Sequence, residues 1–167
     1  MNISEALLSE LDQEIARTRT TLERVPRDKA AFVPHPKSMP MGKLAAHVAQ
    51  LAGFGVTVLT QPGLDFSSGS YKPLVFESPE QLVKAMEEGA AKVREALAGT
   101  PDEAWQQNWK LAFEGKTIFE ASRFLAYRAM FLNHLVHHRG QLGVYLRLNG
   151  IPVPSTYGPS ADEPFLG

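Results

Sequence analysis

The longest helical pattern of the chain is residues 117–149, TIFEASRFLAYRAMFLNHLVHHRGQLGVYLRLN. Apolar residues recur in it at three- and four-residue steps, which is the spacing of one buried face on an α-helix. Asn149-Gly150 follows as a typical C-terminal cap signal, and Pro152 lies just beyond it. A helix of this kind needs partner helices against which to bury its apolar face.

Three earlier segments have the same amphipathic pattern and supply those partners. They are residues 4–24, 41–61 and 79–98. Ser78-Pro79 suits the start of the last one, with Ser as N-cap and Pro at the first helical position. The pattern predicts an all-α four-helix bundle, with long crossover connections at 25–40 and 61–77 and an irregular, proline-rich C-terminal tail from 151 to 167. We expect one domain over residues 1–167, because a chain of this length buries a sufficient core.

Composition excludes several classes of partner. The chain has 167 residues, with 17 Lys and Arg against 18 Asp and Glu, and it has no cysteine. This balance gives no basic surface for nucleic acid or for anionic membranes. The most apolar segment, 43–59, is interrupted by His47, Gln50 and Thr57, so it predicts a buried helix rather than a membrane span. Because residues 1–20 lack the pattern of a signal peptide, we expect a cytoplasmic protein.

Two segments between the helices have no sustained helical period. Residues 64–76 are long, irregular and rich in Gly and Ser, which makes them a candidate functional loop, although they contain no phosphate-binding motif. Residues 100–115 contain Trp105, Trp109 and Phe113, and they predict a short hairpin or an extended cover. These aromatic side chains either line a pocket or, as we favour, pack in the core or at a dimer contact.

The histidines carry the clearest chemical signal. His134 and His138 lie one helical turn apart, so their rings can approach one ion, whereas His137 points away from that face. His47 lies on the apolar face of the 41–61 helix and can complete a three-histidine site inside the bundle. His35 lies in the proline-rich connection, where we expect no functional role.

Three neutral imidazoles are suitable ligands for a divalent transition metal and leave a coordination position open. Zn²⁺ and Ni²⁺ are the first candidates, followed by Fe²⁺, Co²⁺ and Mn²⁺. The residue after His134 is Leu135, where a zincin protease carries its glutamate base, so that peptidase chemistry is disfavoured. The alternative is that the histidines are purely structural and hold no metal.

Other polar residues are candidates for a supporting role. Gln141, Tyr127 and Tyr145 can orient a substrate or a metal-bound water, although we expect both tyrosines to be packing residues. Asp162 in the tail can accept a hydrogen bond from a ligand histidine, or it can be a solvated charge. Arg139 points away from the histidine pair and is expected to pair with a carboxylate on another helix or in the tail.

Three motifs carry a resemblance to a known family: GKLAAH at 42–47, NHLVHHRGQL at 133–142 and VPSTYGPSADE at 153–163. With them the sequence resembles the DinB-like family of metal-dependent bundle proteins, also called the DinB/YfiT-like superfamily, over nearly the whole chain. The resemblance implies a left-handed four-helix bundle with a long crossover, frequent homodimers and a divalent ion on three histidines. Carried over to this chain, those ligands are His47, His134 and His138.

The resemblance also suggests a reaction class. Similar proteins include transferases for low-molecular-weight thiols and a thiol-dependent maleylpyruvate isomerase. It therefore implies a metal-dependent enzyme, most simply a thiol-dependent S-transferase that uses a low-molecular-weight thiol and a small-molecule substrate. One alternative is a metal-dependent hydrolase with a metal-activated water. Another is a non-catalytic, stress-related protein that binds a metal or a small ligand.

Overall fold

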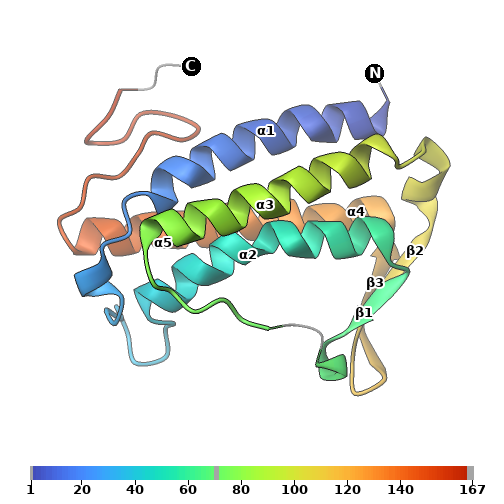
Figure 1. Cartoon of the computed structure of the whole chain (residues 1–167), viewed down its shortest axis with the longest axis horizontal. Coiled ribbons are helices and arrows are strands. Elements are labelled where there is room, and N and C mark those ends of the chain that lie inside the picture. Colours follow the sequence, from blue (N-terminus) through green and yellow to red (C-terminus); the bar gives the residue numbers. More distant parts are fainter. Residues whose placement is uncertain (1, 70–71, 165–167) are drawn as a thin grey trace.

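The computed structural model describes residues 2–69 and 72–164, and over these residues it contains four long helical segments arranged side by side (Figure 1). They are α1 (Ile3–Leu22), α2 (Met41–Thr60), α3 (Pro79–Ala98) and a last segment that ends in α5 (Asn133–Leu148). Helix α1 packs on α3 and α5, and α2 packs on the same two helices. Because α1 and α2 therefore occupy diagonal positions, the connection between them crosses one end of the bundle, as expected for a long crossover.

The helix starts follow from local side-chain chemistry. Asn2 accepts a hydrogen bond from the backbone N–H of Glu5, and the Glu5 carboxylate accepts one from the backbone N–H of Asn2, which together form a capping box. Ser78 caps α3 by accepting from the backbone N–H of Gln81, with Pro79 at the first helical position, as predicted. Such caps satisfy backbone N–H groups that have no partner within the helix.

The expectation of a purely all-α fold is wrong in one region. Within the described residues, a three-stranded sheet lies at one end of the bundle (Figure 1). Strand β1 (Gly63–Asp65) pairs in parallel with β2 (Asn108–Phe113), and β2 pairs antiparallel with β3 (Lys116–Ser122). Only the first strand of the short hairpin expected within 100–115 lies there; the hairpin spans 108–122, and its second strand occupies residues that also fit the helical pattern.

The last helical segment therefore begins at Arg123 rather than at 117. Glu114 and Gly115 have φ values of 49° and 74°, and two successive residues with positive φ make a tight hairpin turn whose twist matches that of the flanking strands. Chain reversal there pairs 116–122 with β2, and Ser122 then caps the helix by accepting from the backbone N–H of Leu125. Apolar periodicity over so few residues does not distinguish helix from strand.

The last segment is also irregular inside. It consists of α4 (Arg123–Tyr127), a π-helical turn η4 (Arg128–Leu132) and α5. A π turn holds an additional residue compared with an α turn, so residues before it are rotated relative to those after it. Short 3-10 turns lie in the connections: η1 (Arg27–Lys29), η2 (Phe66–Ser68) and η3 (Asp102–Gln106).

Apolar side chains from all the long helices form the core, and α2 contributes the most continuous set of buried residues. Gly55 leaves room for the ring of Phe131, since a Cβ at that position would lie 2.6 Å from it. Residues 151–164 of the tail lie along α1 and α5, where Arg24 pairs with Glu163 and Arg147 pairs with Asp162. None of the helices in the described part of the chain has both the length and the apolar character needed to cross a membrane.

Residues 70 and 71 of the expected functional loop, and residues 165–167 of the expected tail, lie outside the described residues.

Candidate metal centre

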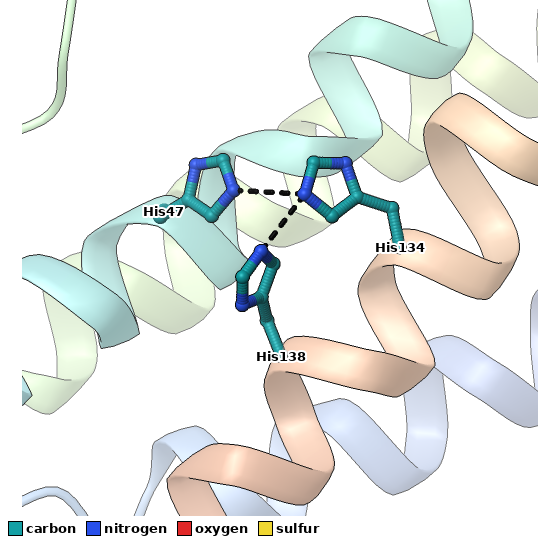
Figure 2. Close-up of side chains that lie close together, drawn as sticks. All are labelled: His47, His134 and His138. Atoms are coloured by element: carbon teal, nitrogen blue, oxygen red, sulfur yellow. Dashed lines mark hydrogen bonds between the residues drawn. The ribbon is translucent and has the colours of Figure 1, made fainter. Parts of the chain in front are cut away.

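Three histidines from the two helices α2 and α5 point toward one another (Figure 2). His134 Nε2 lies 2.8 Å from His138 Nε2 and 3.3 Å from His47 Nε2. One nitrogen from each residue lies within 4.8 Å of the others. All three side chains are only partly buried, so the cluster lies at the edge of the core and not inside it.

Local sequence explains each placement. His134 and His138 share one face of α5 because residues four apart are neighbours on a helix. His47 lies between the buried residues Leu44 and Leu51 on the face of α2 that packs toward α5. The packing of these two helices brings a histidine at position 47 to a pair at positions 134 and 138.

Contacts of the Nδ1 atoms fix the orientation of the His134 and His138 rings. His138 Nδ1 lies 2.7 Å from Gln141 Oε1, and His134 Nδ1 lies 3.3 Å from the backbone carbonyl oxygen of Met130. Because an oxygen of this type only accepts, the proton of each neutral ring is on Nδ1. Both Nε2 atoms therefore carry lone pairs, and these lone pairs point toward the same region between α2 and α5.

A cation between the rings would satisfy these lone pairs. Two lone pairs at 2.8 Å repel each other unless a cation or a shared proton lies between them. In a tetrahedral zinc site with Zn–N bonds of about 2.0–2.1 Å, two ligand nitrogens are about 3.3 Å apart. The His47–His134 distance of 3.3 Å has that value, and the His134–His138 distance of 2.8 Å is shorter by about 0.5 Å. Three imidazole nitrogens are a donor set that suits a divalent transition metal.

The protonation tendencies favour metal binding as well. Burial, followed by the nearby His138 and His134, lowers the pKa of His47 to about 4. Burial also lowers the pKa of His134 and of His138, and in both rings a neighbouring histidine adds to the effect. Rings that are neutral at physiological pH are ready to act as ligands, since a metal need not displace a proton.

A cavity of about 720 Å³ reaches His47 and His134 from the side of the sheet. Its lining includes apolar side chains from α2, the η2 turn, β2 and the π turn: Leu51, Phe54, Phe66, Leu111 and Met130. Gln50 and Lys72 are among its polar residues. Gln50 also anchors the segment between β1 and α3. Its amide donates to the carbonyl of Lys72 and accepts from the N–H of Leu74.

The sequence profile of the DinB superfamily matches residues 10–142, which include all three histidines of the cluster. The chain belongs to the DinB superfamily.

Solved structures with the DinB-like fold agree with this assignment. A DinB-like protein from Bacillus subtilis is 18% identical, with a TM-score of 0.68 over 90% of this chain and 97% of that one. A DinB-like protein from Bacillus cereus is 20% identical, with a TM-score of 0.69 over 92% and 97%. A DinB family protein from Exiguobacterium sibiricum is 20% identical, with a TM-score of 0.68 over 93% and 97%. No curated protein matches the chain.

Of the supporting residues proposed from the sequence, Gln141 contacts the histidine cluster directly, as described above. The Tyr127 ring packs against Trp105 and Phe131 in the core. The Tyr145 hydroxyl donates to the carbonyl of Met39. Asp162 accepts from Arg147, far from the cluster.

A regular helix would place Tyr127 on the same side as His134, because the two residues are seven positions apart, or about two turns. The π turn lies between Tyr127 and His134 and changes the rotation of one relative to the other. Trp105 and Trp109 are both fully buried, which confirms them as core residues, whereas Phe113 is 50% exposed and does not belong to the core.

The sequence pattern does not reveal the parts of the site that come from irregular backbone. The carbonyl of Met130, inside the π turn, orients His134, and Phe66 and Lys72 reach the cavity from the connection after β1. The position of Gln141, three residues after His138 on the same helix, does predict a contact between their side chains. No comparable pattern marks a π turn or a cavity wall.

Proposed function

We propose that the chain is a metal-dependent enzyme whose divalent ion is held by His47, His134 and His138, and that it transfers a low-molecular-weight thiol to a small electrophilic substrate. The observation that carries the proposal is the cluster of three Nε2 atoms at the end of an apolar cavity. Zn²⁺ or Ni²⁺ is the expected ion. A divalent ion in this position would lower the pKa of a coordinated thiol or water.

Each nearby residue has a role in this proposal. Gln141 and the Met130 carbonyl hold the α5 rings in the orientation that aims Nε2 at the ion. The apolar cavity wall excludes water and holds the organic part of the substrate next to the site. Since the chain has no cysteine, the reacting sulfur must come from the thiol substrate.

The access to the site supports an enzyme over a closed, non-catalytic receptor. The described part of the tail packs on α1 and α5, where it contacts Arg17, Arg24 and Arg139, and none of its described residues lines the cavity. The cavity leads to His47 and His134 from the opposite side, where a substrate can enter. A catalytic metal site requires such an open position, whereas structural zinc is normally closed by four protein ligands.

The lack of a carboxylate among the described residues that line the cavity favours thiol transfer over hydrolysis. A metal-bound water that attacks a substrate usually needs a nearby general base. Among the described residues that line the cavity, none is an aspartate or a glutamate. A thiol with a lowered pKa releases its proton to solvent before it reacts, so it needs no such base. Hydrolysis remains the alternative reaction for the same ion.

We expect the protein to act as a homodimer, as the family resemblance implies. Val144 and Leu148 lie one turn apart on α5, and each is 58% exposed. Pairs of exposed apolar side chains on a helix suit a contact between two copies. Light scattering of the wild type and of a variant with lysine at both positions tests this expectation.

Elemental analysis of tag-free protein, purified without chelating resin, tests the metal site. We expect about one transition metal ion per chain in the wild type and in His35→Ala, and a clear loss in His47→Ala. His35 is the matched control because it is a histidine in an exposed connection outside the cluster. Equal metal content in the wild type and His47→Ala would show that His47 is not a metal ligand and would exclude a site shared by α2 and α5.

A second measurement tests the reaction. Metal-loaded wild type should accelerate the consumption of a small thiol in the presence of an alkylating electrophile, and His47→Ala should not. Metal-dependent ester or amide cleavage without thiol consumption would select the hydrolase instead.

A further inference from the structure

The lining of the cavity beside the histidine cluster indicates what kind of molecule fits it. Phe54 and Phe66 have ring centroids 6.0 Å apart, and Phe54 meets the buried ring of Trp109 at 6.1 Å, edge to face. Rings at these separations and angles form a wall that favours another aromatic or flat apolar group. The volume of about 720 Å³ is within the range of roughly 300–1,000 Å³ typical of sites for small organic molecules.

The glycine at position 53 indicates that the cavity beside it is kept open for a ligand. It lies inside α2, where glycine costs roughly 1 kcal/mol relative to alanine. Gly55 on the same helix has a packing reason, because Phe131 occupies the place of its side chain. Gly53 has no such reason: a Cβ there would meet no atom within 4 Å, and the residue lines the cavity.

The charges around the cavity favour an anion. Lys72 is a cationic residue in the lining, and no carboxylate is found among the described lining residues. Three neutral histidines leave the double charge of a bound divalent ion uncompensated. A ligand with one negative group toward the ion and an apolar body toward the aromatic wall satisfies both ends of the cavity.

We infer that the cavity binds an amphipathic anion: a single carboxylate or thiolate head at the histidine cluster, and an aromatic body between Phe54, Phe66 and Met130. This inference rests on the proposed function for the metal at the head position. It adds the class of the organic substrate. The space over Gly53 admits the aromatic body, and a Cβ at position 53 meets no atom within 4 Å, so a larger side chain there extends into the cavity and competes with the ligand.

Titration calorimetry on Zn²⁺-loaded protein tests the inference with simple probes. We expect 3-phenylpropionate to bind at least tenfold more tightly than acetate, which lacks the body, and than 3-phenylpropan-1-ol, which lacks the charge. A parallel titration with 2-phenylethanethiol distinguishes a sulfur head from a carboxylate head. Tighter binding of either compound than of both controls supports the class.

The decisive variant is Gly53→Leu, with Ala91→Leu on the exposed face of α3 as its control. Gly53→Leu should bind 3-phenylpropionate at least tenfold more weakly, with acetate binding and metal content unchanged. Ala91→Leu should bind all the probes like the wild type. Equal affinity of Gly53→Leu and the wild type for 3-phenylpropionate, or equal affinity of the wild type for 3-phenylpropionate and acetate, would overturn the inference.

Metal content measured on the same samples separates this result from a failure of the proposed function. If the protein binds no metal, the proposed function fails, and 3-phenylpropan-1-ol is then titrated into the metal-free protein. A loss of at least fivefold in Gly53→Leu would still support the aromatic subsite. Unchanged affinity would overturn it.

Discussion

Arg139 and Glu14 form a buried ion pair, with Nη2 of the arginine 2.7 Å from Oε2 of the carboxylate and side-chain exposures of 3% and 5%. The pair joins α5 to α1 one residue after the cluster histidine His138. The Tyr157 hydroxyl completes it, since it accepts from Arg139 and donates to Glu14. This network fixes the rotation of α5 about its axis and fastens the tail to the bundle. The expected pairing of Arg139 with a carboxylate of another helix is confirmed.

Replacing Arg139 by Met should destabilise the fold by about 1–3 kcal/mol, because Glu14 loses its buried cationic partner and keeps only Arg17 and the Tyr157 hydroxyl. Urea unfolding followed by circular dichroism measures the effect. Arg147→Met is the control, since Arg147 pairs with Asp162 at the surface and such pairs contribute about 0–1 kcal/mol. Similar losses in the two variants would show that burial of the Arg139–Glu14 pair has no special effect.

Gln141→Leu should weaken metal binding about 10- to 100-fold with little loss of stability. The change removes the acceptor for the His138 Nδ1–H, and second partners of ligand histidines have effects of this size. Competition with a chromogenic chelator gives the affinity. An unchanged affinity would mean that His138 is oriented without Gln141.

His137→Ala should keep one metal per chain, whereas His138→Ala should lose it. Both residues lie on α5, but only His138 is in the cluster. The comparison checks the rotation of the helix directly. Metal loss in His137→Ala alone would place the wrong face of α5 toward α2.

The stability of the metal-free protein should fall as the pH decreases from about 6.5 toward 4. Burial, with nearby His138 and His134, lowers the pKa of His47 from its ordinary value of 6.5 to about 4 in the folded chain. Between these values the unfolded chain binds a proton at position 47 that the folded chain does not, so acid favours unfolding. Above pH 6.5 His47 is neutral in both the folded and the unfolded chain, so it causes no further change of stability with pH.

Unfolding free energies measured across this pH range, for the wild type and for His47→Gln, test the effect. The variant should have a flatter profile because position 47 no longer titrates. Identical slopes between pH 4 and 6.5 would show that His47 does not cause the loss.

Two glycine-to-alanine changes should have opposite effects on stability. Gly53→Ala should stabilise the protein by about 0.5–1 kcal/mol, because alanine favours the helix and the added Cβ meets open space. Gly89→Ala should destabilise it by about 1–3 kcal/mol, because the added Cβ would lie 2.9 Å from the Cβ of Ala52 on α2. Thermal unfolding of both variants measures the difference. A gain of stability in Gly89→Ala would mean that α2 and α3 separate without cost.

Much of the helical framework could be predicted because its signals are local. The bounds 79–98 follow from the Ser78 cap, Pro79 and the apolar spacing, and the structure has α3 at the same residues. The second strand of the hairpin could not be predicted in the same way. Its residues also fit a helical pattern, and only pairing with Asn108–Phe113 decides between the two.

The sequence by itself determined the amphipathic faces and the position of His134 and His138 on one face of a helix. Its composition also determined that the protein has no cysteine and no excess of basic residues. Each of these depends on spacing within one helix or on composition. Only the tertiary structure decided that His47 meets that pair, that a π turn separates Tyr127 from it, and that Gly53 opens onto a cavity. These features depend on how segments far apart in the chain pack together, and a helical period specifies which face is buried but not which partner buries it.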